Sequence, residues 1–115
     1  MPGAAYDPTQ QVNVHVVSKS PHTFAYRLWV ARPGATAWEP LGTGTIDSAA
    51  TDYGPFPAST RLAYTLLMAG HPATDWKTEV LLSQRGAPLD CSPAAETGRT
   101  DEGGVARRDR AVALH

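Results

Sequence analysis

The stretch that decides the fold is Arg61-Leu62-Ala63-Tyr64-Thr65-Leu66-Leu67-Met68-Ala69-Gly70. Successive side chains of a β-strand point to opposite faces, and here apolar residues occupy both faces. This pattern predicts a central strand with something covering each side. The stretch is too short for a stable solitary helix, and turn residues bound it at Pro57 and at Gly70-His71-Pro72. We therefore expect an all-β domain with residues 61–69 in the middle of a sheet.

Three other segments alternate in the same two-residue period and predict half-buried strands. Their apolar phases are Val12, Val14 and Val16 in 10–19; Phe24, Tyr26, Leu28 and Val30 in 23–32; and Trp76, Thr78, Val80 and Leu82 in 76–84. Residues 38–46 are less regular because Pro40 and Gly42 interrupt them. Proline cannot donate a hydrogen bond to a neighbouring strand, so this segment predicts an edge strand or a bulge. Residues 47–57 predict a long connection.

The two ends of the chain differ from the middle. Residues 1–9 carry little apolar bulk and predict a flexible leader. Residues 91–115 hold few large aliphatic side chains and a Gly-rich polar stretch, which predicts a polar tail or a long loop. A closing strand over 110–114 is the alternative for that segment.

Together these patterns predict a single antiparallel β-sandwich over residues 10–90. The strand spacing resembles immunoglobulin and fibronectin type III domains in general architecture only. Cys91 is alone, so the Cys–Trp–Cys core of immunoglobulin domains is missing, and residues 57–64 do not have the usual spacing of a tyrosine corner.

The composition excludes several classes of function. The formal net charge of −1 provides no field that would attract nucleic acid or an acidic membrane surface. No stretch approaches the roughly 20 apolar residues of a membrane-spanning helix. The N-terminus lacks the basic and apolar regions of a secretory signal, so we expect a cytoplasmic location, with a fragment of a secreted chain as the alternative.

No catalytic, cofactor or metal site is predicted. The histidines are not spaced as ligands on one strand or one helical turn, and the acids in the connections lack the spacing of a calcium loop. These residues are His15, His22, His71, His115, Asp47, Asp52, Asp75 and Asp90. Gly42-Thr43-Gly44 has no following helix and is not a phosphate-binding loop. We therefore expect a non-enzymatic protein without a cofactor.

One apolar surface is the candidate for contact with a partner. Trp29 shares a phase with Arg27, and the outer phases of the strands at 23–32, 61–69 and 76–84 would gather Trp29, Leu67 and Leu81, with Trp38 nearby. A patch of this kind predicts a binding face for a protein partner or for self-association, unless residues 47–57 or the C-terminal segment cover it.

Two alternatives to a protein partner stay open. In the first, Trp29 or Trp38 forms a stacking platform for a carbohydrate or another small ligand, with Asp and Arg side chains supplying hydrogen bonds. In the second, the chain is an accessory subunit of an enzyme or of a larger assembly, because a site shared with another chain would not be legible here.

Overall fold

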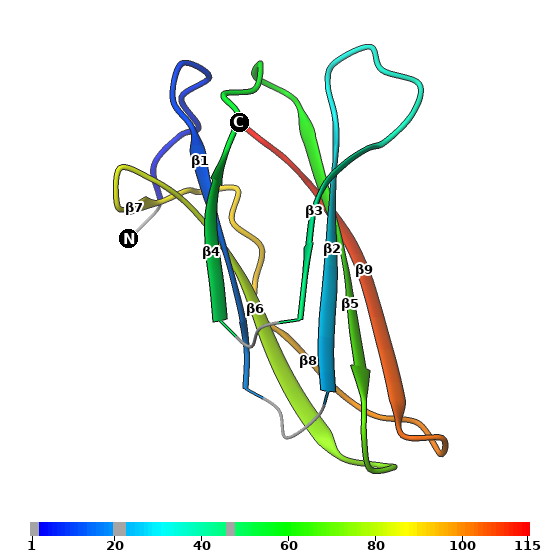
Figure 1. Ribbon diagram of the computed structural model, residues 1–115. Coiled ribbons are helices and arrows are strands. Elements are labelled where there is room, and N and C mark those ends of the chain that lie inside the picture. The colour runs from blue at the N-terminus through cyan, green and yellow to red at the C-terminus, as the bar shows by residue number, and fades with distance from the viewer. Residues whose placement is uncertain (1–2, 20–22, 46–47) are drawn as a thin grey trace.

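The computed structural model describes residues 3–19, 23–45 and 48–115. These residues form two antiparallel sheets that face each other, so the fold is a β-sandwich (Figure 1). The five-stranded sheet has the order β4-β1-β6-β7, with β8 also paired to β6, and the four-stranded sheet has the order β3-β2-β5-β9. The strands are β1 (Val12–Ser18), β2 (Thr23–Ala31), β3 (Glu39–Gly44), β4 (Ser48–Tyr53), β5 (Arg61–Ala69), β6 (Asp75–Gln84), β7 (Ala87–Pro88), β8 (Glu96–Arg99) and β9 (Val105–Ala113).

Strand β5 is central, as its sequence predicts. It lies between β2 and β9 and pairs with both along its whole length. Its inner phase is completely packed against the opposite sheet. On its outer phase Thr65 is buried, Ala63 and Leu67 are only half-buried, and Arg61 and Ala69 are exposed. The expected cover over the outer face is therefore wrong, because the second sheet covers one side of β5 and only neighbouring side chains shelter the other.

A single core fills the space between the sheets. The inner phases predicted for β1, β2 and β6 are all buried in it, which confirms the period-two interpretation of those segments. The core residues from the strands are Val12, Val14, Val16, Phe24, Tyr26, Leu28, Val30, Leu62, Tyr64, Leu66, Met68, Trp76, Val80 and Leu82.

Strands β3 and β4 each lie at the edge of a sheet, and the sequence predicted only β3. Strand β3 ends its sheet and its register with β2 shifts between Leu28 and Trp29, so both the edge and the irregularity predicted from Pro40 are present. Strand β4 corrects the expectation of a plain connection over 47–57, because it pairs with β1. Only Ala49 and Tyr53 of β4 are half-buried, so the strand has no apolar phase that the sequence pattern could reveal.

The C-terminal segment is part of both sheets. Strand β8 pairs with β6, and β9 pairs with all nine residues of β5. Of the two alternatives for residues 91–115, the structure has the closing strand, and that strand is longer than 110–114. The inner phase of β9 carries Arg108 and Arg110, whose side chains reach across to Glu96 of β8. This polar lining at the margin of the sandwich hides the strand from a hydrophobic pattern.

The N-terminal segment is also anchored, which corrects the expectation of a flexible leader for its second half. Ala4 forms a parallel bridge with Leu89, and Tyr6 is buried in the core. The Tyr6 hydroxyl donates to the carbonyl oxygen of Phe56 at 2.7 Å and accepts from the Phe56 amide at 3.0 Å. Because both hydrogen bonds of the phenol are made inside the protein, the ring can be buried without an unpaired polar atom.

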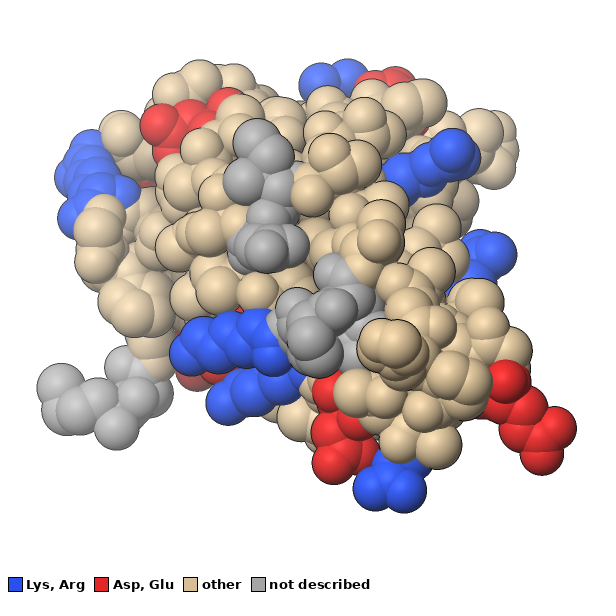
Figure 2. Space-filling model, turned by 60° about the horizontal axis from the view of Figure 1, so that its bottom comes forward, with Lys and Arg blue, Asp and Glu red and all other residues tan. Residues whose placement is uncertain are grey.

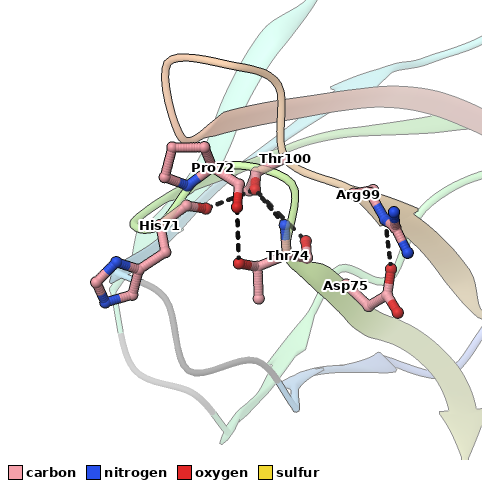
Figure 3. Close-up of polar contacts among 6 residues, drawn as sticks. All are labelled: His71, Pro72, Thr74, Asp75, Arg99 and Thr100. Atoms are coloured by element: carbon pink, nitrogen blue, oxygen red, sulfur yellow. Dashed lines mark hydrogen bonds and ion pairs between the residues drawn. The ribbon is translucent and has the colours of Figure 1, made fainter.

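Thr100 joins the β5–β6 turn to the segment between β8 and β9 (Figure 3). Its buried hydroxyl donates to the carbonyl oxygen of His71 at 2.7 Å and accepts from the amide of Thr74 at 2.9 Å. The Thr74 hydroxyl, in contrast, makes an exposed hydrogen bond to the Pro72 carbonyl at 3.1 Å. Thr100 therefore supplies the internal hydrogen bonds that hold the two segments together.

We expect Thr100→Val to lower the free energy of unfolding by about 1–3 kcal/mol, because the Thr74 amide and the His71 carbonyl lose a part-buried partner. Thr74→Val is the matched control, and the loss of its exposed hydrogen bond should cost less than about 0.5 kcal/mol. Urea denaturation of both variants measures the difference. Equal losses would contradict the role given to the Thr100 hydroxyl.

Leucines in the core and on the outer surface of the sandwich differ in how deeply they are buried. Leu66 of β5 is fully buried, whereas Leu81 of β6 is 40% exposed on the outer side of the other sheet. We expect Leu66→Ala to destabilise the protein by about 2–5 kcal/mol, since it leaves a cavity in the core. Leu81→Ala should change stability by less than about 1 kcal/mol. Thermal and urea unfolding test this, and a large loss for Leu81→Ala would mean that its face is covered.

Candidate functional site

The outer face of the four-stranded sheet carries a groove beside Trp29. In the cross-strand register Trp29 lies opposite Ala63, and Ala63 lies opposite Ala111 of β9. Trp29 and two alanines therefore occupy one row across the sheet. Because the alanine side chains are much shorter than the indole, the surface is lower over them and a hollow forms. The groove has a volume of about 490 Å³, and Trp38 from the β2–β3 loop also lines it.

The two tryptophans of the groove are held differently. Trp29 is half-buried on the regular backbone of β2, so its position follows from the strand. Trp38 is 41% exposed and precedes β3 in the loop that projects at the upper right of Figure 1. The Arg61 guanidinium lies 5.0 Å from the centre of the Trp38 ring, a cation–π contact that fixes the indole at the side of the groove.

Polar groups close one end of the groove. Thr65 of β5 and Asp109 of β9 are register partners, and the Thr65 hydroxyl donates to Asp109 Oδ1. Arg107 Nε donates to Asp109 Oδ2 at 3.0 Å. These hydrogen bonds from Thr65 and Arg107 lower the pKa of Asp109 below its ordinary value, so the carboxylate stays charged and able to accept hydrogen bonds in mildly acidic solution.

Only two of the four candidate contact residues come together. Trp29 and Trp38 share the groove, and Leu67 is on the same face but is separated from Trp29 by the pair Arg27 and Thr65. Leu81 belongs to β6 in the other sheet, where it lies opposite His15. The prediction that Leu81 shares one patch with Trp29 is therefore wrong. The reason is topological, because β5 and β6 lie in different sheets and their outer phases face opposite sides of the molecule.

The histidines and acids named as possible ligands from the sequence do not come together among the described residues. Among the described residues, no group of three or more His, Cys, Asp or Glu side chains has the arrangement of a metal site. His15 contacts Ser48, Asp52 contacts Asn13, and His71 uses its carbonyl oxygen while its ring points away from Thr100 (Figure 3). The candidates His22 and Asp47 lie outside the described residues.

Charged side chains do not gather at the end of the sandwich seen in Figure 2, where Lys and Arg form small groups separated by other residues and by acids. In the part of the chain that the structure describes, no helix has the length and hydrophobicity needed to cross a membrane.

A second polar cluster closes the open side of the sandwich. Glu96 of β8, only 5% exposed, accepts from Arg110 Nε at 2.7 Å and from Arg110 Nη2 at 3.0 Å, and Arg108 Nε lies 3.6 Å from it. The Tyr64 hydroxyl also donates to Glu96, at 3.3 Å. The hydrogen bonds from Arg110 lower the pKa of Glu96, while burial, followed by the charge of Glu96, raises the pKa of Tyr64 to about 12.

The chemistry of the groove was only partly accessible from the sequence. Trp29 stands out because a large aromatic breaks the outer phase of its strand. Asp109 and Ala111 carry no such signal, because they enter the site only through the pairing of β9 with β5. The charged residues Arg107, Arg108, Asp109 and Arg110 alternate between the two faces of β9, so only Arg107 and Asp109 lie on the face of the groove.

Comparison with known proteins supplies no information on function. The chain matches no protein family model, no curated protein and no solved structure.

The Glu96 cluster predicts a loss of stability in acid. Its folded-state pKa lies below the ordinary 4.5, so its contribution is fully present above about pH 4.5 and is lost as pH falls through the lower folded-state value. We expect Glu96→Gln to be less stable than the wild type at pH 7. Its free energy of unfolding should also fall less steeply than that of the wild type between about pH 5 and pH 3. Urea midpoints measured across this range test it.

Asp75→Asn is the control for that experiment. Asp75 pairs with Arg99 at 3.0 Å, but both side chains are largely exposed, so the pair should contribute little at any pH. If Asp75→Asn and Glu96→Gln reduce the pH dependence of the free energy of unfolding equally, the prediction that buried Glu96 causes the loss of stability in acid is wrong.

Proposed function

We propose that the protein is a non-enzymatic β-sandwich binding module, of immunoglobulin-like general architecture, that holds a carbohydrate in the groove on its four-stranded sheet. The observation that carries the proposal is the pair Trp29 and Trp38, which line one groove beside a row of alanines. The sequence alone favoured a protein contact, with a carbohydrate as the alternative. The arrangement of the groove reverses that order.

The groove suits a ring with one apolar face and a polar rim. A pyranose presents C–H groups that stack on an indole, and its hydroxyls point outward around the ring. The groove provides indoles at Trp29 and Trp38, and Thr65 with Asp109 at one end for hydroxyl groups. Its volume of about 490 Å³ is within the roughly 300–1,000 Å³ of small-molecule sites.

A protein contact is less well supported by the same face. A stable protein interface buries on the order of 800 Å² per partner around an apolar centre. The apolar residues available for such a centre are divided, since Leu67 lies beyond the Arg27 and Thr65 pair and Leu81 is on the other sheet. The continuous apolar part of the face is therefore the groove itself.

Binding to a panel of neutral and acidic oligosaccharides tests the proposal. We expect at least one to change tryptophan fluorescence and to bind in isothermal titration calorimetry. Trp29→Ala and Trp38→Ala should each weaken that binding about tenfold or more, because each removes a stacking surface. Leu81→Ala, on the other sheet, is the matched control and should bind normally.

Two results would overturn the carbohydrate proposal. One is silence of the wild-type protein across the whole panel at millimolar ligand. The other is binding that survives both tryptophan substitutions, which would locate the ligand elsewhere. Thermal unfolding of each variant establishes that the domain is still folded.

A further inference from the structure

Trp29 separates two hollows. On its other side a second depression of about 290 Å³ runs toward β3, and its lining includes Arg27, Pro40 and Thr43. Trp29 lines both depressions, so together they form one path across the strands from β9 to β3. A path with an indole at its middle fits a ligand of at least two consecutive rings better than a single ring.

The charges around this path are unbalanced. On the outer phase of the described strands of this sheet the acid is Asp109, and it pairs with Arg107 at 3.0 Å. Arg27 and Arg61 are exposed, and neither makes an ion pair with any described residue. Among the described residues, two positive charges on the face that carries the path therefore have no ion-pair partner.

These two arginines lie on opposite sides of Trp29. Arg27 is opposite Thr65, one row from the Trp29 and Ala63 pair, and Arg61 is one row away in the other direction. Since strands advance about 3.3 Å per residue, the two rows are about 13 Å apart along the strands, with Trp29 midway. Arg27 lines the smaller hollow, and Arg61 lies over Trp38 at the side of the larger one.

Resting on the proposed function, we propose that the carbohydrate is acidic, an extended oligosaccharide of uronate units that crosses the strands over Trp29. Guanidinium groups bind carboxylates through two parallel hydrogen bonds, so Arg27 and Arg61 would each take one carboxylate. Successive units of a β-1,4-linked uronate chain point their carboxylates to opposite sides. This alternation matches one arginine on each side of the Trp29 row.

Two β-1,4-linked tetrasaccharides that differ only at C6 of each unit provide the test: tetramannuronate, with a carboxylate there, and its carboxyl-reduced form mannotetraose, with a hydroxymethyl group. At low salt we expect the uronate to bind about tenfold or more tightly, and this advantage should shrink at 0.5 M NaCl as the charges are screened. Arg27→Gln and Arg61→Gln should each weaken binding of the uronate severalfold more than they weaken binding of the neutral ligand, because only the uronate loses a carboxylate partner. Arg99→Gln, on the other sheet, is the matched control.

The outcomes separate this inference from the proposed function. Equal affinity for the two tetrasaccharides, or binding only to neutral sugars of the panel, would overturn the acidic ligand and leave the carbohydrate site standing. An equal loss in Arg99→Gln would overturn it too, because a general charge effect would then explain the preference. If no oligosaccharide binds, both the inference and the proposed function are wrong.

Discussion

The whole structure depends on the pairing of β5 with a partner on each side. Because β2 and β9 satisfy its backbone hydrogen bonds on both edges, one phase of its side chains can be packed entirely into the core. Leu62, Tyr64, Leu66 and Met68 provide that packing. The same pairing brings Ala63 of the outer phase between Trp29 and Ala111, so the core and the groove are built on two faces of one strand.

Charged side chains join the two sheets at the edge formed by β8 and β9. Where β9 ends its sheet, Arg108 and Arg110 reach Glu96 of the opposite sheet, and Tyr64 joins them from the core. A carboxylate this deeply placed is tolerated because it accepts two hydrogen bonds from Arg110 and one from Tyr64, and so is paired with positive charge. Arginines along a marginal strand also discourage unwanted pairing with another chain.

How far the sequence reveals the structure depends on whether a strand has a buried phase. Strands β1, β2 and β6 alternate clearly and β5 is apolar on both phases, so the sequence predicts all four. Strands β4 and β9 lie at sheet margins and have polar or small residues where an apolar phase would be. Trp29 was recognisable as a site residue from its own strand alone. Asp109 was not, because its place beside Thr65 results from a pairing between segments more than forty residues apart.

The alanines of the groove have a consequence for how such a protein can diversify. Ala63 and Ala111 set the depth of the hollow, yet neither belongs to the core. A larger side chain at either position would fill the hollow from below while the inner faces of the strands stayed as they are. Ligand preference and folding are therefore encoded at different positions of the same strands, and selection can alter the first without eroding the second.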